Sequence, residues 1–342
     1  MIRASIVGAS GFAGGELLRL LVAHPEIKVV AAGASSQAGK PVSSVFPGLN
    51  SCPDESFATL DQAWTAEADL VFVSLPQGES SRLPAEHSGR VIDLAGDFRL
   101  NEPANFADWH GSPHSQPTAL QNWVYGLTEF HRNEIESASR IANPGCYAAA
   151  AILALGPLLE AGLIEPEGIH IQAASGVSGA GRASGQGFDF ASANENLRAY
   201  SPTGHNHIPE IEQELGLLAG APVLITFIPH LVPMTRGILV SAVAQASNGE
   251  NTQALTDAIK ARYEKEAFVR ALDPNVLPET KQLTGTNFAE TSVRKDERTG
   301  KVLAFAAIDN LGKGAAGQAI QNANLMFGFD ESAGLAGSAL IP

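Results

Sequence analysis

The feature that most constrains the fold is a glycine-rich turn near the N-terminus, which joins an apolar segment to an amphipathic one. Residues 3–8 are typical of a short β-strand, and from residue 15 leucines recur at helical spacing. Between them runs Gly8-Ala-Ser-Gly11-Phe-Ala-Gly14. A strand, a glycine loop and a helix in this order predict a dinucleotide site, because glycines let the backbone approach a pyrophosphate and the helix start offers free N–H groups. A plain tight turn is the alternative.

The loop after the second predicted strand, residues 27–32, indicates which dinucleotide binds. NAD-binding proteins usually carry an acid there, which binds the ribose 2′-hydroxyl. No Asp or Glu occurs at residues 27–53. The loop instead carries two hydroxyls and an ammonium group, on Ser35, Ser36 and Lys40. These groups suit a 2′-phosphate, so we expect NADP, although a polar loop that merely lacks an acid is the alternative.

Further apolar segments at 69–76 and 90–95 alternate with helical ones. This alternation predicts an α/β fold with a Rossmann-type, doubly wound parallel sheet. Ligands in such sheets bind beyond the carboxyl ends of the strands, which places residues 74–78 and 97–99 near the cofactor. The Arg99 side chain suits a substrate carboxylate, with an ion pair to Asp97 as the alternative.

The bulk composition bounds the class of protein. A chain of 342 residues with 44% hydrophobic and 17% charged residues is expected to fold into two domains. A net charge of −14 argues against a nucleic-acid partner, because phosphate contacts need clustered Lys and Arg. No apolar run is long enough to span a membrane and no leader opens the sequence, so we expect a cytoplasmic protein. The two cysteines, Cys52 and Cys146, form neither a disulfide framework nor a zinc motif.

Cys146 lies in the most informative segment, Asn143-Pro-Gly-Cys146-Tyr followed by an alanine-rich run. Pro144 and Gly145 end what precedes them, and the alanines predict a helix. Cys146 is then at a helix N-terminus, where the dipole and free N–H groups stabilise a thiolate. Cys52 has no motif around it and is interpreted as incidental.

A thiolate nucleophile needs an acid–base partner, and residues 203–212 offer His205 and His207. Two alternatives stay open. The pair could ligate a metal with Glu210, or could cap a helix that starts near Pro209. Between the cysteine and the histidines, the glycines and serines of residues 173–185 suit an anion-binding nest with Arg182 supplying charge; a flexible surface loop is the alternative.

These motifs resemble the N-acetyl-gamma-glutamyl-phosphate reductases, the NADPH enzymes of arginine biosynthesis in the aspartate-semialdehyde-dehydrogenase-like superfamily. The matching stretches are Val7-Gly-Ala-Ser-Gly, Asp93-Leu-Ala-Gly-Asp-Phe-Arg-Leu, Val124-Tyr-Gly-Leu-Thr-Glu, Asn143-Pro-Gly-Cys-Tyr, Ser175-Gly-Val-Ser-Gly-Ala-Gly-Arg, His205-Asn-His-Ile-Pro-Glu-Ile-Glu and Asp309-Asn-Leu-Gly-Lys-Gly-Ala-Ala-Gly-Gln. They span residues 7–318 in the expected order.

The resemblance implies that Cys146 attacks an acyl phosphate to form a thioester, with His205 as acid–base partner, and that NADPH reduces the thioester to N-acetyl-glutamate 5-semialdehyde. Together, motifs and resemblance predict cofactor contacts at Gly8, Ser10, Gly11, Phe12, Ala13, Gly14, Ser35, Ser36, Lys40, Pro76, Ser178, Gly179 and Asn310. They predict substrate contacts at Arg99, Asn143, Arg182, Tyr200 and His207. No metal is expected.

The same resemblance implies the domain organisation. A Rossmann domain of residues 1–146, completed by a C-terminal helix in 310–342, is expected beside an α+β substrate and oligomerisation domain of residues 147–309. Homo-oligomers, tetramers or dimers, are expected, with a small-molecule acyl phosphate as the other partner.

The sequence departs from the family pattern at Gln77, Ala148 and Asn206, where His, Thr and Arg are usual. Asn206 puts the electrostatics around His205 in doubt. Two other functions stay open: the same chemistry on an aminoadipyl phosphate in lysine biosynthesis, and a non-catalytic NADP-binding regulator. The Asn-Pro-Gly-Cys-Tyr context argues against an aspartyl phosphate.

Overall fold

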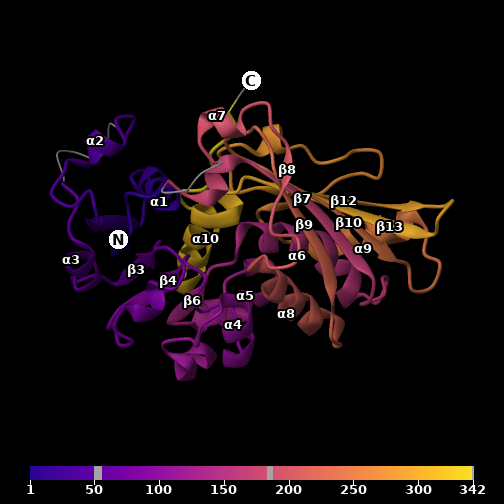
Figure 1. The fold of residues 1–342 in the computed structure, drawn as a ribbon, viewed down its shortest axis with the longest axis horizontal. Helices are drawn as coiled ribbons and strands as arrows, with labels where there is room; N and C mark the ends of the chain where they lie inside the picture. The colour runs from indigo at the N-terminus through magenta and orange to yellow at the C-terminus, as the bar shows by residue number, and fades with distance from the viewer. Residues whose placement is uncertain (50–55, 183–187, 341–342) are drawn as a thin grey trace. The chain divides into compact units, whose positions relative to one another are not determined.

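The structure, a computed structural model, describes residues 1–49, 56–182 and 188–340. Cys52 lies outside the described residues. The chain divides into two compact units (Figure 1). Unit 1 comprises residues 1–144, 181–183 and 315–337, and unit 2 comprises residues 145–180, 184–314 and 338–342. The boundaries predicted above at 146/147 and 309/310 remain a proposal beside this division.

Unit 1 is built on a six-stranded sheet with the order β2-β1-β3-β4-β6-β5. Every neighbouring pair in it is parallel, which confirms the predicted Rossmann-type sheet. The strands are β1 (Ile2–Val7), β2 (Ile27–Gly33), β3 (Leu70–Val73), β4 (Arg90–Asp93), β5 (Val124–Tyr125) and β6 (Arg140–Ala142).

The helices of unit 1 are α1 (Phe12–Leu21), α2 (Val42–Val45), α3 (Leu60–Trp64), α4 (Pro103–His110), α5 (Thr128–Ser137) and α10 (Gly317–Met326), with short 3₁₀ turns at Ser80–Arg82 and Pro117–Asn122. α3 begins in a complete capping box between Thr59 and Gln62. Its residues Ala63 and Trp64 pack on the valines of β1, β3 and β4, so β-branched strand residues form this part of the core.

α10 contributes buried amides in addition to its buried apolar residues. Gln318, Gln321, Asn322 and Asn324 are all completely buried. Asn322 Nδ2 donates to the Gly126 carbonyl over 2.8 Å, and Gln318 Nε2 donates to Thr128 Oγ1 over 2.9 Å. These bonds join α10 to the loop after β5 and to the first residue of α5, so the last helix completes unit 1.

Unit 2 is built on a seven-stranded mixed sheet with the order β11-β12-β13-β10-β7-β9-β8. The strands are β7 (Ile169–Ser175), β8 (Arg198–Ala199), β9 (Ile225–Leu231), β10 (Ile238–Gln245), β11 (Val269–Ala271), β12 (Ala289–Asp296) and β13 (Lys301–Ile308). β7 pairs with β9 and β11 with β12 in parallel, and the other pairs are antiparallel. The predicted second, α+β domain is thereby confirmed.

The helices of unit 2 are α6 (Cys146–Glu160), α7 (Phe190–Ala193), α8 (His207–Ala219) and α9 (Thr252–Tyr263), with 3₁₀ turns at Val177–Ala180 and Thr280–Leu283. A π-helical turn, η5 (Gly312–Ala316), leads from unit 2 back into unit 1. α6 packs against α8 and strands β10 and β13, and α9 packs against β12. The alanine-rich α6 is buried from Tyr147 to Leu159, because small side chains let it lie close to the sheet.

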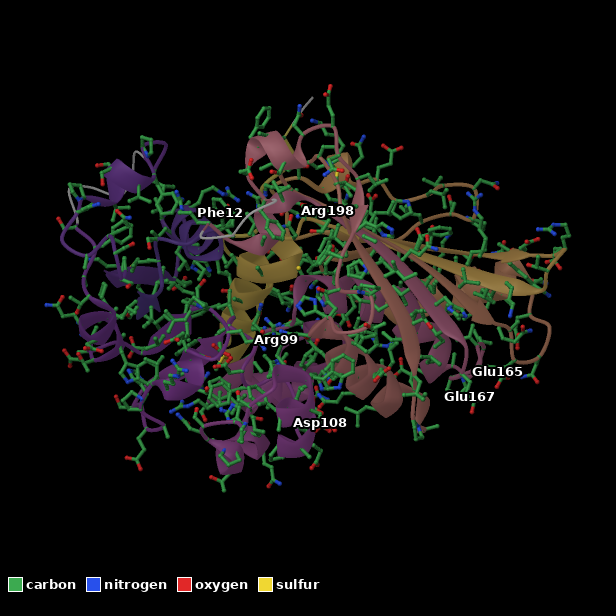
Figure 2. The ribbon with its side chains drawn as sticks, in the orientation of Figure 1. Phe12, Arg99, Asp108, Glu165, Glu167 and Arg198 are labelled. Atoms are coloured by element: carbon green, nitrogen blue, oxygen red, sulfur yellow. The ribbon has the colours of Figure 1, made fainter. Side chains whose placement is uncertain are left out.

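The sheet of unit 2 has two distinct ends. Figure 2 shows Glu165 and Glu167, which precede β7, far from Arg198 of β8. Arg198 is paired in register with Leu231 at the end of β9, and Leu231 is paired with Ser175 at the end of β7. The candidate site described below lies at this second end. In the described part of the chain, no helix is both long and apolar enough to cross a bilayer.

Candidate active site

Cys146 is the first residue of α6, with Gly145 as the N-cap. No side chain caps this helix end, so the helix dipole acts on the Cys146 thiol without a competing side-chain cap. The Cys146 side chain is half-buried. Gly314 of the π-helical turn lies directly against it, since a Cβ at Gly314 would lie 2.8 Å from the Cys146 Cβ. The thiol therefore has a fixed backbone environment on both sides.

The N-terminus of α8 fixes Gly145. The Gly145 N–H donates to Glu210 Oε1 over 2.7 Å, and the His207 ring occupies the space that a side chain at Gly145 would need. Gly145 has an ordinary φ of −69°, so the ring of His207, not backbone strain, explains the glycine here. The segment before the thiol is thus held by one hydrogen bond and one ring contact.

A cavity of about 210 Å³ opens beside Cys146 within unit 2. Its lining consists of Cys146, Tyr147, Ser175, Gly176, Gly179, Ala180, Phe188, Tyr200, His205, His207 and Leu231. The structure therefore brings together the predicted nucleophile, both predicted histidines, Tyr200 and Gly179. None of these described lining residues is Lys, Arg, Asp or Glu.

His205 is held as a neutral imidazole. Its Nδ1 accepts the N–H of His207 over 3.1 Å, and α8 begins at His207, two residues before the predicted start. Burial lowers the pKa of His205 to about 4. Because Nδ1 accepts a hydrogen bond, the single proton of the neutral ring is on Nε2. The capping alternative thus holds for one contact, in which His205 Nδ1 accepts the N–H of His207 at the start of α8. This contact also determines the tautomer of His205.

The metal alternative finds no support in the described residues. Across residues 1–49, 56–182 and 188–340, no group of three His, Cys, Asp or Glu side chains is arranged to hold a metal ion. Glu210, the predicted third ligand, instead binds the Gly145 N–H.

The glycine loop of unit 1 requires two of its three glycines. Gly8 has a φ of +95°, and a Cβ there would collide with the Ser74 carbonyl. A Cβ at Gly14 would collide with the Gly8 carbonyl. α1 begins at Phe12 with Gly11 as N-cap and no side-chain cap, so Ser10 to Gly14 surround a helix start. This backbone suits the close approach of a pyrophosphate, and the loop fits a dinucleotide.

The residues predicted to bind a 2′-phosphate follow β2. Ser35, Ser36 and Lys40 are all exposed. Lys40 Nζ donates to Gln37 Oε1 over 3.0 Å, and Gln37 Nε2 donates to Ser36 Oγ over 3.4 Å. Two hydroxyls and an ammonium group thus lie on one exposed turn, and together they could bind an anion such as a phosphate.

Arg99 and Asn143, two predicted substrate contacts, bind other parts of unit 1. Arg99, labelled in Figure 2 in the loop after β4, donates from Nε to the Asn143 carbonyl over 2.8 Å and from Nη2 to the Leu94 carbonyl over 3.0 Å. The buried Asn143 amide donates to the Ala315 carbonyl over 3.1 Å and accepts from Asn322 over 3.2 Å. These bonds fix the backbone three residues before the thiol.

Asp97 holds the loop that contains Pro76. Its two oxygens accept the N–H groups of Gly78 and Ser81 over 2.7 and 2.9 Å. Burial, together with the charge of Asp97, raises the pKa of Asp93 to about 7. Pro76 itself is exposed at the carboxyl end of β3, where ligands of such sheets bind.

The remaining predicted contacts fall in both units. The Arg182 guanidinium lies over the rings of Phe12 and Phe46, at 5.0 and 4.8 Å from their centroids, in unit 1. In unit 2, Asn310 Nδ2 donates to Ser178 Oγ over 2.9 Å and Asn310 Oδ1 accepts the Gly237 N–H over 2.8 Å. Ser178, Gly179 and Asn310 therefore form one cluster beside the cavity.

Several lining residues were missed by sequence reasoning. Tyr147 directly follows the nucleophile on the first turn of α6, so its place in the sequence was enough to predict that it lies near the site. Ser175 ends β7, at the sheet edge where a site is expected, which is a weaker reason to predict it. Phe188 and Leu231 come from other segments, and no local pattern places them beside Cys146.

Comparisons with known proteins agree with the geometry. The semialdehyde dehydrogenase NAD binding domain matches residues 3–138, and the semialdehyde dehydrogenase dimerisation domain matches residues 146–310. An N-acetyl-gamma-glutamyl-phosphate reductase of Symbiobacterium thermophilum is 46% identical over 98% of this chain and 97% of its own. One of Geobacter metallireducens is 45% identical over the whole of both chains.

Solved structures share the fold at low identity. Aspartate semialdehyde dehydrogenase II of Vibrio cholerae superposes with a TM-score of 0.72 at 18% identity, over 96% of this chain and 98% of that chain. The enzyme of Candida albicans, solved with NADP, gives a TM-score of 0.65 at 16% identity, again over 96% and 98%.

Proposed function

The chain belongs to the family of N-acetyl-gamma-glutamyl-phosphate reductases, and we propose that it reduces N-acetyl-L-glutamyl 5-phosphate to N-acetyl-L-glutamate 5-semialdehyde and phosphate in arginine biosynthesis. The observation that carries this function is the Cys146 thiol at a helix start, in one cavity with two imidazoles. A thiolate at such a position is a nucleophile suited to an acyl group.

Cys146 forms the covalent intermediate in this proposal. The thiolate sulfur bonds to the acyl carbon, the carbon–oxygen bond to phosphate breaks, and inorganic phosphate leaves with that electron pair. A bound nicotinamide cofactor supplies the hydride that reduces the resulting thioester. When the carbon–sulfur bond then breaks, the thiolate is restored and the aldehyde is released.

His205 stabilises the developing charge on the acyl oxygen by donating a hydrogen bond to it, and its proton stays on the ring. Its neutral ring carries the proton on Nε2, because Nδ1 accepts the His207 N–H. Nε2–H can therefore donate to the oxygen that gains charge as the tetrahedral centre forms. The same nitrogen is not free to take the thiol proton. Among the described cavity residues, His207, whose ring lies against Gly145, is the base that remains for that proton.

NADP is the dinucleotide that we propose. The support is the exposed turn with Ser35, Ser36 and Lys40, together with the lack of Asp or Glu at residues 27–53, because a carboxylate would repel a 2′-phosphate. We expect Lys40→Glu to weaken NADPH binding by at least about 10-fold and NADH binding much less. Equal losses for both dinucleotides would contradict this role of Lys40.

Three further proposals follow from membership in this family. We propose that residues 1–146 with 310–342 form the cofactor domain and residues 147–309 the substrate domain. The match to a dimerisation domain supports a homo-oligomer, which we propose to be a dimer or tetramer. We also propose a cytoplasmic location.

The test of the function is phosphate-dependent reduction of NADP by N-acetylglutamate 5-semialdehyde, which avoids the unstable acyl phosphate. The N-acetyl-aminoadipate and aspartate semialdehydes run beside it. We expect activity with the acetylglutamate aldehyde at least about 10-fold above that with the aminoadipate one, since one methylene changes binding by about 1–3 kcal/mol. A higher rate with the aminoadipate aldehyde would reassign the substrate, and inactivity with all three would favour the regulator.

A further inference from the structure

A hollow of about 440 Å³ opens in unit 1 at the amino ends of strands β1, β3 and β4. Its polar and aromatic lining residues are Arg3, Glu67, Asp69, Ser88, Arg90 and Phe327. Ligands of doubly wound sheets bind at the carboxyl ends of the strands, where the glycine loop lies, so the hollow is at the opposite edge from the proposed cofactor site. Its volume falls in the range of small-molecule sites, about 300–1,000 Å³.

Arg90, the first residue of β4, has no acidic partner among the described residues. Its guanidinium lies over the Phe327 ring, 4.6 Å from the ring centroid. Arg90 Nη1 is buried and has no hydrogen-bond partner in the described part of the chain. The ring holds the cation in place but neutralises none of its charge, so a bound carboxylate would supply the partner that these protein groups do not.

Two exposed carboxylates line the same hollow. Glu67 Oε2 pairs with Arg3 Nη1 over 3.1 Å, and Asp69 Oδ2 accepts the Arg3 N–H over 2.8 Å. The Arg90 N–H donates to the Asp69 carbonyl over 2.9 Å, so the two backbones run side by side, at the strand spacing of about 4.8 Å. An unpaired cation and a carboxylate are therefore neighbours at this sheet edge, and they do not pair with each other.

The balance of charge in the hollow determines which class of ligand suits it. A lone anion would be attracted by Arg90 but repelled by Glu67 and Asp69, and a lone cation would be repelled by the arginines. A molecule with a carboxylate and an ammonium group on one carbon can pair with both signs at once. The substrate of the proposed function has an acylated nitrogen and lacks this ammonium group, so a different molecule fits here.

We propose that this hollow binds a free α-amino acid with a cationic side chain. The carboxylate of the ligand pairs with Arg90, its ammonium group pairs with Asp69, and its side chain pairs with Glu67. The hollow shares no lining residue with the Cys146 cavity, so it is a second site for a small molecule, beside the one that carries the proposed reaction.

The test is isothermal titration calorimetry of the full chain with L-arginine and three analogues that each lack one of its charges. We expect one-to-one binding of L-arginine with a Kd of about 1 mM or tighter. N-acetyl-L-arginine lacks the ammonium group and L-argininamide lacks the carboxylate, so each should bind at least about 10-fold more weakly. L-citrulline, with a neutral side chain, should bind about 2-fold to 5-fold more weakly, because Glu67 is exposed. No binding of L-arginine, or equal affinities for all four molecules, would overturn the proposal.

Two variants place the ligand in this hollow. Arg90→Gln and Asp69→Asn should each weaken L-arginine binding at least about 10-fold, and the Asn side chain can still accept the Arg3 N–H. Arg82→Gln is the matched control and should bind like the wild type, because Arg82 is an exposed arginine of unit 1 that pairs with Glu79 outside the hollow. Wild-type affinity in both Arg90→Gln and Asp69→Asn would overturn the site. Competition by N-acetylglutamate 5-semialdehyde would also overturn it, by placing the amino acid in the cysteine cavity.

Discussion

The glycine loop of unit 1 and the cysteine cavity of unit 2 are built in opposite ways. The loop is a continuous stretch of chain in which neighbouring backbone carbonyls exclude a Cβ at Gly8 and at Gly14. The cavity is lined mainly by side chains from residues 146 to 231, and its chemistry depends on their identity. The comparison teaches that backbone sites fail through added atoms, whereas side-chain sites fail through removed ones.

One buried group in each unit gives the stability a pH dependence of opposite sign. Asp93 of unit 1 has a raised pKa of about 7, so its contribution to the free energy of unfolding is full below about pH 4 and is lost as the pH rises to 7. His205 of unit 2 has a lowered pKa of about 4. Its contribution to the free energy of unfolding is therefore full above pH 6.5 and is lost as the pH falls to 4.

The largest expected effect is removal of the nucleophile from the side-chain site. Cys146→Ser should lower kcat by at least about 10⁴-fold, because a hydroxyl at this position is not ionised. NADPH affinity, measured by fluorescence titration, should change less than about 2-fold. Cys52→Ser is the matched control and should keep full activity. Turnover in Cys146→Ser within 10-fold of wild type would rule out the thioester.

Removal of the His205 hydrogen-bond donor should have the next largest effect. His205→Gln should lower kcat by about 10²-fold to 10³-fold, since the acyl oxygen loses its donor. Because the pKa of His205 is about 4, its titration should not appear in the wild-type kcat profile between pH 5.5 and 8. A wild-type limb near pH 6.5 that disappears in His205→Gln would show that this histidine acts from its charged form.

An added methyl group should damage the backbone site. Gly8→Ala should destabilise unit 1 by more than about 3 kcal/mol, from the left-handed φ and the collision with the Ser74 carbonyl, and weaken NADPH binding at least about 10-fold. Gly111→Ala is the control, because Gly111 has a φ of +70° but open space around it. Gly111→Ala should lower the free energy of unfolding, measured in urea, by only the about 1–2 kcal/mol that a left-handed φ costs a residue with a side chain. Equal losses in both variants would mean that close approach is unimportant.

The smallest expected effect concerns the pH dependence of unit 1. In the wild type, ionisation of Asp93 should lower the free energy of unfolding by at most about 1.4 kcal/mol per pH unit between pH 4 and 7. Asp93→Asn should abolish this pH dependence. Trp64, Trp109 and Trp123 all lie in unit 1, so tryptophan fluorescence in urea reports on this unit. Asp108→Asn, at the exposed Asp108 labelled in Figure 2, is the control and should keep the wild-type slope. An unchanged slope in Asp93→Asn would place the titration elsewhere.

The sequence predicted those parts of the molecule that local chemistry determines. The Gly8–Gly14 turn, the parallel strands and the helix start at Cys146 each depend on neighbours within a few residues, and these predictions agree with the structure. The contact of Gly314 with Cys146 depends on packing between segments far apart in the chain. No local pattern contains it.

The candidate site shows the same limit. His205 and Cys146 were assigned from motifs, but the tautomer of His205 follows from the start of α8 at His207 rather than near Pro209. Arg99 and Asn143 are predicted to bind substrate, and the hydrogen bonds described above join them to the backbone and amides of unit 1. Whether they also bind substrate stays a prediction, because one side chain can do both.

Unit 1 is built from both ends of the chain, and this has a consequence for the order in which the two units can fold during synthesis. Residues 1–144 leave the ribosome first, but α10 lies in residues 315–337, after nearly all of unit 2. Until then the Gly126 carbonyl and the Asn143 amide lack Asn322, their buried partner. We therefore expect unit 1 to complete its core only after unit 2 has been synthesised. Unit 2 can complete its sheet while the nascent unit 1 still awaits its last helix.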